Sequence, residues 1–275
     1  MPELPEVETI VRGLRNHLVG FTINFVDLQR KDLRFPIPKT LNKSISGKKI
    51  INIHRRGKYI AISNEANQTI ILHLGMSGRI KIRKINSKKD KHDHIIIKLN
   101  NNNEIVFNDP RRFGMIDLIN NNNFANHKWI SSLGPEPLES AFTQSYVADY
   151  LSSKKSSIKS VLLNQKFVAG LGNIYVCESL FLAGIAPTRV ANTINDNNIK
   201  NLIFSIRKVL KKAIKLGGCS IRDYVQASGE MGYFQQKLNV YGKSGKKCYT
   251  CNCSSSIKKI TQNGRSTFFC SKKQR

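Results

Sequence analysis

The chain opens with Met1-Pro2-Glu3-Leu4-Pro5-Glu6, and the helix that this stretch begins organises the first half of the fold. Behind it, apolar residues recur at the three-to-four-residue spacing of an amphipathic helix. They are Val7, Ile10, Val11, Leu14 and Leu18. Pro5 and the acids that follow it also suit the first turn of a helix. We therefore predict a helix over residues 3–19, which Gly20 ends.

The same stretch has a chemical interpretation that centres on Pro2. Residue 2 is small, so we expect the initiator methionine to be removed, which leaves the ring nitrogen of Pro2 as a free secondary amine. An α-amino group titrates near ~8, so a useful fraction is nucleophilic at neutral pH. Attack on a sugar C1′ would give an iminium ion, with Glu3 as a neighbouring acid or base. An ordinary helix start is the alternative, and six residues alone do not decide.

The composition points to a polyanionic partner. The 275 residues suggest two domains with a small module attached. They carry 45 Lys and Arg against 18 Asp and Glu, a formal net charge of +27 and a pI of about 10.1. Such a field attracts nucleic acid first. The alternative is a genome bias toward Lys, Asn and Ile that produces a solvated lysine surface.

We expect a cytoplasmic monomer without a membrane span. The start of the chain is acidic and lacks the apolar run of a signal peptide. The apolar stretch 167–187 has a single charge, Glu178, and several glycines, so it is interpreted as a buried helix with its first turn. In such a compartment, clustered cysteines indicate a metal before a disulfide.

Periodicity divides the chain into a β-rich and a helical part, an α+β fold in two domains. Short β-branched runs between turn residues predict a β-sandwich. These predicted strands are 21–28, 49–54, 59–63, 69–74, 79–84, 94–99, 104–108 and 115–119. After a linker at 133–138, helices are predicted at 143–152, 156–165, 172–183 and 195–215. The domains are then 1–134, 135–240 with a polar loop at about 217–237, and 241–275.

Two turns of the predicted sandwich carry candidate groups. Lys58, in Arg55-Arg56-Gly57-Lys58-Tyr59, could bind a phosphate or donate a proton, although a solvated hairpin tip is the simpler interpretation. The turn Asp109-Pro110-Arg111-Arg112-Phe113-Gly114 places a Phe beside two Arg. Such a pair can enter a duplex where a base has left, and Met76 could fill the vacated stack. The alternative is a Phe packed under its own hairpin.

The helical part adds a glycine turn and a cysteine cluster. Gly170-Leu171-Gly172-Asn173-Ile174-Tyr175 opens a helix, where amides can bind phosphate, or where glycines merely allow tight packing. The tail carries Cys248, Cys251, Cys253 and Cys270 in uneven spacing, enough for one tetrahedral zinc. Between them Gly264-Arg265-Ser266-Thr267 is predicted to be a hairpin tip. A metal-free hairpin with a surface Arg is the alternative.

These segments together resemble the bacterial formamidopyrimidine-DNA glycosylases, the oxidised-purine branch of the helix-two-turn-helix repair enzymes. The matching segments are Pro2 to Thr9, Arg56 to Tyr59, His73 to Gly78, His92 to His94, Asp109 to Gly114, Leu133 to Leu138, Gly172 to Tyr175, Gly232 to Phe234, Val240 to Gly242 and Gly264 to Phe268. Each match alone is weak, but their number and order over nearly the whole chain make the resemblance specific.

The resemblance implies a bifunctional repair enzyme for damaged double-stranded DNA, a DNA glycosylase with AP lyase activity. In that family an oxidised purine, 8-oxoguanine or a formamidopyrimidine, is flipped into a pocket. Pro2 would attack C1′, with Glu3 as its acid–base partner. Lys58 would donate a proton in β-elimination and Arg265 in δ-elimination. The loop at 217–237 matches the segment that closes on the lesion.

The resemblance also implies DNA contacts and a zinc finger. The DNA-binding positions would be His73, Met76, His92, Arg111, Phe113, Lys154, Asn173 and Tyr241. One departure is visible: the fourth zinc ligand of the family aligns with Lys273, and Asn252 and Cys253 are inserted after the second. Our hypothesis is that Cys253 substitutes, which gives the ligand set Cys248, Cys251, Cys253 and Cys270.

Two other functions compete with this interpretation. The first is a relative that prefers oxidised pyrimidines, against which Arg111, Phe113 and Met76 argue. The second is a basic nucleic-acid-binding protein with a zinc hairpin and no catalysis. It explains the charge and the cysteines, but not the Pro-Glu start together with Lys58 and Arg265.

Overall fold

The computed structural model describes residues 1–219, 233–250 and 255–275. The chain divides into two compact units. Unit 1 comprises Met1–Ser131 with Leu216–Tyr233, and unit 2 comprises Ser132–Lys215 with Phe234–Arg275. The three predicted domain ranges stay predictions. No helix among the described residues is long and apolar enough to cross a membrane.

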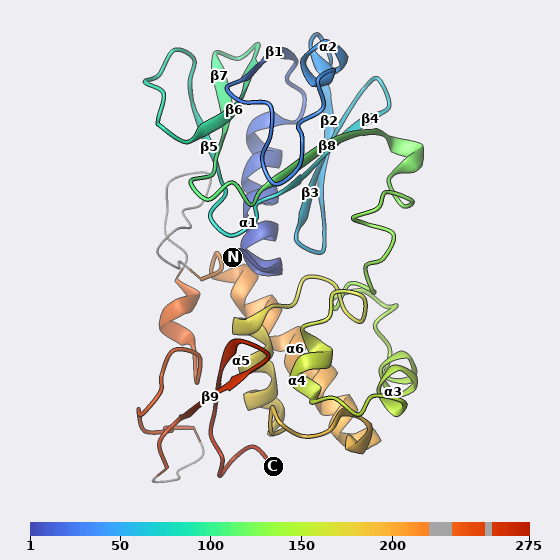
Figure 1. The fold of residues 1–275 in the computed structure, drawn as a ribbon, viewed down its shortest axis with the longest axis vertical. Helices are drawn as coiled ribbons and strands as arrows, with labels where there is room; N and C mark the ends of the chain where they lie inside the picture. Colours follow the sequence, from blue (N-terminus) through green and yellow to red (C-terminus); the bar gives the residue numbers. More distant parts are fainter. Residues whose placement is uncertain (220–232, 251–254) are drawn as a thin grey trace. The chain divides into compact units, whose positions relative to one another are not determined.

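Unit 1 is a sandwich of two antiparallel four-stranded sheets with the helix α1 (Leu4–Leu18) beside it (Figure 1). One sheet has the order β1-β6-β7-β5 and the other β2-β3-β4-β8. The strand bounds are β1 Ile23–Leu28, β2 Ile50–Arg56, β3 Tyr59–Asn64, β4 Gln68–His73, β5 Arg79–Lys84, β6 Asp93–Leu99, β7 Asn103–Asn108 and β8 Met115–Asn120.

The core of unit 1 follows from period-two alternation in the strands. Ile95, Ile97, Ile105 and Phe107 point into one buried cluster, because alternate residues of a strand face the same side of the sheet. The apolar stripe of α1, from Val7 to Leu18, belongs to the same cluster. Helix α1 packs on β2 and β3, so the sandwich fixes its position.

Unit 2 is helical with one hairpin. Its helices are α3 (Gln144–Ser152), α4 (Ile158–Leu162), α5 (Asn173–Ala183) and α6 (Asp196–Lys215). Eight residues of α5 are buried and it is apolar on all sides, as expected for a helix inside a domain. The hairpin joins β9 (Lys258–Gln262) to β10 (Arg265–Phe269) and contacts α5.

The predicted architecture is confirmed. All eight predicted sandwich strands exist with ends that shift by at most a few residues, and the five predicted helices lie where periodicity placed them, although the one predicted at 156–165 is only the five-residue α4. The short helix α2 (Leu41–Ile45) and the 3-10 turns η1 (Asn121–Asn123), η2 (Ala191–Thr193) and η3 (Phe234–Lys237) were not predicted. One or two turns of helix give too little periodicity to detect. Most of the predicted loop at 217–237 lies outside the described residues.

Candidate active site and nucleic-acid interface

The N-terminal residues of unit 1 are held in place rather than frayed. Pro2 is buried, and Glu3 and Glu6 are only 4% and 3% exposed. The Glu6 carboxylate accepts the backbone N–H of Glu3 at 2.9 Å through one oxygen and that of Cys219 at 2.8 Å through the other. Glu6 therefore fixes the start of α1 and ties it to the segment at Leu216–Cys219.

Lys58 lies in the two-residue turn between β2 and β3, where Arg56 pairs with Tyr59. Its side chain is 6% exposed, so it is not a solvated hairpin tip. The turn is linked to α1 through Arg55, which bonds Glu8 at 2.9 Å and the Gly57 carbonyl at 3.1 Å. The same unit thus carries Lys58 and the start of α1 on elements that one arginine joins.

His73 ends β4 opposite Tyr59 and is kept neutral. Burial lowers its pKa to about 4, and the positive charges of Lys58 and Arg34 act in the same direction. The neutral ring accepts the Gly75 N–H at Nδ1, at 2.9 Å, and its centre lies 4.8 Å from that of the tilted Tyr59 ring. His73 therefore holds the turn that follows it while it leaves Nε2 for another partner.

An aromatic stack continues from Tyr59. The Tyr59 ring is stacked at 6.3 Å on Trp129, whose other neighbours include the rings of Phe35 at 5.8 Å and His127 at 4.9 Å. Trp129 is the only tryptophan of the chain. This stack supports the hairpin of Lys58 through Tyr59, whereas the ion pair with Glu8 supports it through Arg55.

Asp109 joins the two turns that hold the predicted duplex-inserting residues. Its carboxylate accepts the Ser77 hydroxyl at 2.5 Å and the Gly114 N–H at 2.7 Å, and its carbonyl accepts His94 Nε2 at 2.8 Å. The Arg111 N–H in turn donates to Ser77 Oγ at 3.1 Å. A side chain at Gly75 would lie 2.4 Å from the Phe113 carbonyl carbon, so only glycine permits this approach.

The joined turns expose Met76, Arg111 and Phe113, together with Pro110 and Arg112. Met76 is 40% and Phe113 44% exposed, and Arg111 is exposed as well. The Arg111 guanidinium lies 5.0 Å from the centre of the Phe113 ring, a cation–π contact. Phe113 is therefore not packed under its hairpin, and it shares one face with a cation. His92 lies next to this turn, because its carbonyl accepts the Asp109 N–H at 3.0 Å.

In unit 2, Asn173 binds the β9–β10 hairpin at the residue next to Arg265. Asn173 is the first residue of α5, and its Nδ2 donates to the Ser266 carbonyl at 2.8 Å. Lys159 donates to the same carbonyl at 3.3 Å and to Thr267 Oγ1 at 2.7 Å. Arg265, adjacent in sequence, is exposed. Burial lowers the pKa of Lys159, and the Arg265 charge acts in the same direction. Cys177 acts in the opposite direction but does not outweigh them.

Tyr241 and Lys154 are held separately in unit 2. Glu178, 1% exposed in α5, accepts the backbone N–H groups of Asn239, Val240 and Tyr241 at 2.8 to 2.9 Å. The Lys154 ammonium lies 4.8 Å from the centre of the Tyr150 ring. Of the proposed zinc ligands, Cys248 and Cys270 are buried in one cluster with Phe268, whereas Cys251 and Cys253 lie outside the described residues.

Comparison with known proteins decides the family. Residues 1–116 match the formamidopyrimidine-DNA glycosylase N-terminal domain, and residues 133–225 match the H2TH domain of the same enzymes. Formamidopyrimidine-DNA glycosylases of Zymomonas mobilis and Ruegeria sp. are 45% and 43% identical, with 100% of each chain covered. The chain belongs to the formamidopyrimidine-DNA glycosylase family.

Solved structures of this glycosylase family agree over the whole chain. The wild-type Lactococcus lactis Fpg (MutM) with a DNA that contains N7-benzyl-Fapy-dG has a TM-score of 0.92 and 38% identity, with both chains fully covered. The Lactococcus lactis Fpg with an abasic-site DNA has a TM-score of 0.92 and 37% identity, with 99% of each chain covered. This chain therefore shares the fold of these glycosylases over its whole length.

The contacts also name supporting residues of the glycosylase that sequence patterns did not single out. They are Glu6, Arg55, Ser77, Asp109 and Glu178. Two had a visible signal: Glu6 lies three residues after the helix cap, the spacing of a capping box, and Glu178 is the single charge in an apolar stretch. The others act through residues far away in sequence, which local patterns do not reveal.

Proposed function

We propose that the protein is a bifunctional glycosylase of DNA repair, which excises oxidised purines through a Schiff base on Pro2 and then cleaves the strand by β,δ-elimination. The observation that carries the proposal is the fixed, buried N-terminal stretch. Pro2 and Glu3 are buried, and Glu6 bonds the backbone of the next residue after Pro2. A nucleophile needs such positioning, whereas an ordinary chain end does not.

The proposed reaction uses four groups in turn. With Met1 removed, the Pro2 nitrogen attacks C1′, the glycosidic bond breaks, and the base departs with its bonding electrons and a proton. Glu3 acts as the acid–base partner at the opening sugar. The resulting iminium ion makes a C2′ proton acidic; water takes up this proton, and the 3′ phosphate leaves with the C3′–O bonding electrons in β-elimination, with Lys58 as proton donor to the leaving group. Arg265 serves in the δ-elimination that expels the 5′ phosphate. Water then hydrolyses the iminium ion and frees Pro2.

The exposed face of the joined turns would replace the flipped base. A base within a duplex is out of reach, and extruding it costs a few kcal/mol, about the energy of lost stacking. Met76, Arg111 and Phe113 lie on turns that Asp109 fastens together, so they can enter the stack without first being ordered. The contact between Arg111 and Phe113 supports their joint insertion.

Phosphate contacts would come from both units. His73, His92, Lys154, Asn173 and Tyr241 supply imidazole, ammonium, amide and hydroxyl groups, which position a backbone without reading its sequence. The neutral His73 has a ring nitrogen left over for a phosphate or water, because Nδ1 is already used. Lesion discrimination must therefore arise from the pocket that receives the flipped base. The preference for oxidised purines over oxidised pyrimidines is part of the proposal.

One structural zinc ion would complete the hairpin. Two of the proposed ligands, Cys248 and Cys270, are buried and belong to one small cluster, which suits thiolate coordination. Lys273, at the position of the fourth family ligand, has its ammonium 4.4 Å from the centre of the Phe181 ring. We therefore keep Cys251 and Cys253 as the remaining ligands. When bound, the ion would brace the strand that carries Arg265.

Borohydride trapping on DNA that contains 8-oxoguanine opposite cytosine tests the enzyme directly. The wild-type protein should form a covalent adduct and release a strand with phosphates at both ends of the gap. Pro2→Gly should lose at least tenfold in trapping, because a primary amine on a more flexible residue replaces the ring nitrogen, and Pro5→Ala serves as the matched control. Absence of any adduct would favour the non-catalytic DNA binder. Faster release of thymine glycol would favour the pyrimidine branch.

A further inference from the structure

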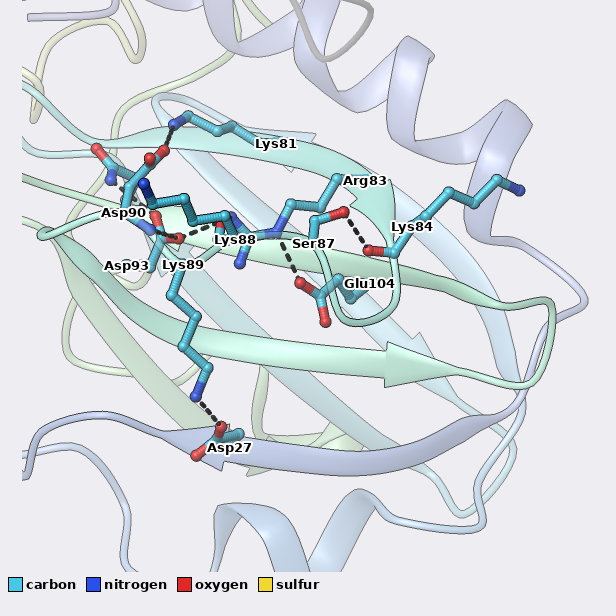
Figure 2. A network of polar contacts seen from close by, with 11 residues as sticks. Asp27, Lys81, Arg83, Lys84, Ser87, Lys88, Lys89, Asp90, Asp93 and Glu104 are labelled. Atoms are coloured by element: carbon cyan, nitrogen blue, oxygen red, sulfur yellow. Dashed lines mark hydrogen bonds and ion pairs between the residues drawn. The ribbon is translucent and has the colours of Figure 1, made fainter.

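Strands β5 and β6 follow each other in sequence but are not neighbours, because β7 lies between them. Residues 84–92, here called the crossover strap, must therefore pass over β7. They run on the outer face, since the other face of the sheet fills the sandwich core. Figure 2 shows the strap from close by, with side chains of β5 and β1 reaching toward it.

A buried ionic network fixes the strap to the sheet. Arg83 on β5 bonds Glu104 at 2.6 Å and Asp93 at 2.9 Å, and both carboxylates are at most 4% exposed. The same guanidinium donates to the Lys88 carbonyl at 3.0 Å. Asp93 also accepts the Asp90 N–H at 2.9 Å. One buried group of charges thus holds the strap backbone at Lys88 and at Asp90.

Two exposed ion pairs extend the attachment across the sheet. Lys81 on β5 bonds Asp90 at 2.6 Å, and Lys89 bonds Asp27 on β1, the far strand of the sheet, at 3.0 Å (Figure 2). Each pair is worth little alone because its partners are solvated. Together with the Arg83 network, however, they set the direction of the strap from β5 toward β1.

Three lysines of the strap take no part in these ion pairs. Lys84, Lys88 and Lys91 are exposed, and within the described part of the chain they form no ion pair. In Figure 2 the Lys84 side chain extends away from the network. The strap ends at His92, whose carbonyl binds the Asp109 N–H beside the turn of Arg111 and Phe113. A pre-ordered row of cations therefore leads up to that turn.

We propose, on the basis of the proposed function, that the crossover strap binds duplex DNA outside the lesion, with Lys84, Lys88 and Lys91 on the phosphates of one flank. Lysines that only keep a surface solvated do not need an ordered backbone. The backbone of this strap is ordered by charges whose burial is costly, which indicates a binding role. An ordered backbone lets the cations bind without a further loss of chain entropy. The uncompensated positive charge matches phosphate rather than an apolar or basic partner.

The test is the salt dependence of binding to an uncleavable duplex that carries a central tetrahydrofuran abasic site. Replacing Lys84, Lys88 and Lys91 by Gln together should weaken binding about tenfold near physiological salt. It should also make the plot of log affinity against log salt shallower by about 2 to 3, because about 0.9 counterions are released per phosphate contact. Two shorter duplexes, each truncated on one side of the lesion, locate the contact.

The truncated duplexes and a charge-matched variant decide the outcome. The proposal requires that the loss persist on one shortened duplex and disappear on the other. Lys200, Lys208 and Lys211, exposed on α6, are replaced by Gln in the control, which removes the same charge from unit 2. An unchanged slope in the strap variant, an equal change in the control, or an equal loss on both shortened duplexes would each overturn the proposal.

Discussion

At the residue scale, the described site depends on polar side chains that are buried and satisfied. Glu6, Asp109 and Glu178 each accept at least two hydrogen bonds from backbone or hydroxyl groups while almost inaccessible to water. A carboxylate without such partners would not remain charged in the interior. Each one instead fixes a chain segment that carries a proposed functional group: Glu3, Arg111 or Tyr241.

His73 provides a pH-dependent prediction at this scale. Its pKa of about 4 in the folded chain lies below the ordinary value of 6.5, so the unfolded chain binds the proton more tightly. The stabilising contribution of the neutral ring is complete above pH 6.5 and is lost as the pH falls toward 4. The full difference is about 3 kcal/mol. The free energy of unfolding of the wild type, measured in urea, should therefore fall as the pH is lowered over this interval.

His73→Asn isolates that contribution. The Asn carbonyl can accept the Gly75 N–H in place of Nδ1, but it does not titrate. The variant should lose stability less steeply than the wild type between pH 6.5 and 4. Parallel curves for the two proteins would show that His73 is not the group responsible, and that carboxylates account for the slope.

At the element scale, the contact between α1 and the β2–β3 hairpin places Lys58. Glu8 accepts Arg55 and Arg12 through its two oxygens, each at 2.9 Å. Burial tends to raise the Glu8 pKa, but the hydrogen bonds from Arg12 and Arg55 outweigh it, so that the pKa is lowered. The Arg55 side chain is 10% exposed and the Arg12 side chain 60% exposed. The same Glu8 carboxylate therefore forms one largely buried and one solvated ion pair, whose contributions to stability can be compared.

We predict that Arg55→Met costs about 1 to 3 kcal/mol of folding stability, since a partly buried charge loses its partner. It should also slow β-elimination by releasing the turn of Lys58. Arg12→Met, the matched control, should cost no more than about 0.5 kcal/mol and leave elimination unchanged. Chemical denaturation and product analysis on gels measure both. Equal effects of the two variants would refute the positioning role of Arg55.

The elements themselves were largely predictable, and the ties between them were not. The β-branched run at 94–99 and the helical stripe from Val7 to Leu18 are local signals, and both were confirmed. The bonds from Glu6 to Cys219 and from Asn173 to Ser266 join residues 213 and 93 positions apart. Nothing in the local pattern fixes such pairs. Lys58 was assigned from resemblance, but its burial needed the structure.

At the scale of the whole molecule, the proposed zinc site gives a prediction. We predict about one zinc per chain, and its loss together with weaker binding to lesion DNA on treatment with a strong chelator. Cys253→Ser should bind well below one zinc, because only three thiolates remain. Lys273→Met should retain it, since that ammonium contacts Phe181. Elemental analysis decides, and full zinc in Cys253→Ser would remove Cys253 from the ligand set.

The single tryptophan has a practical consequence. Trp129 is stacked on Tyr59, the residue directly after Lys58, and on no second indole, because the chain has none. Selective excitation of indole fluorescence therefore reads out one location in the entire polypeptide. A shift in emission on mixing with substrate would follow the surroundings of the proposed elimination lysine in real time, without any dye, label or substitution.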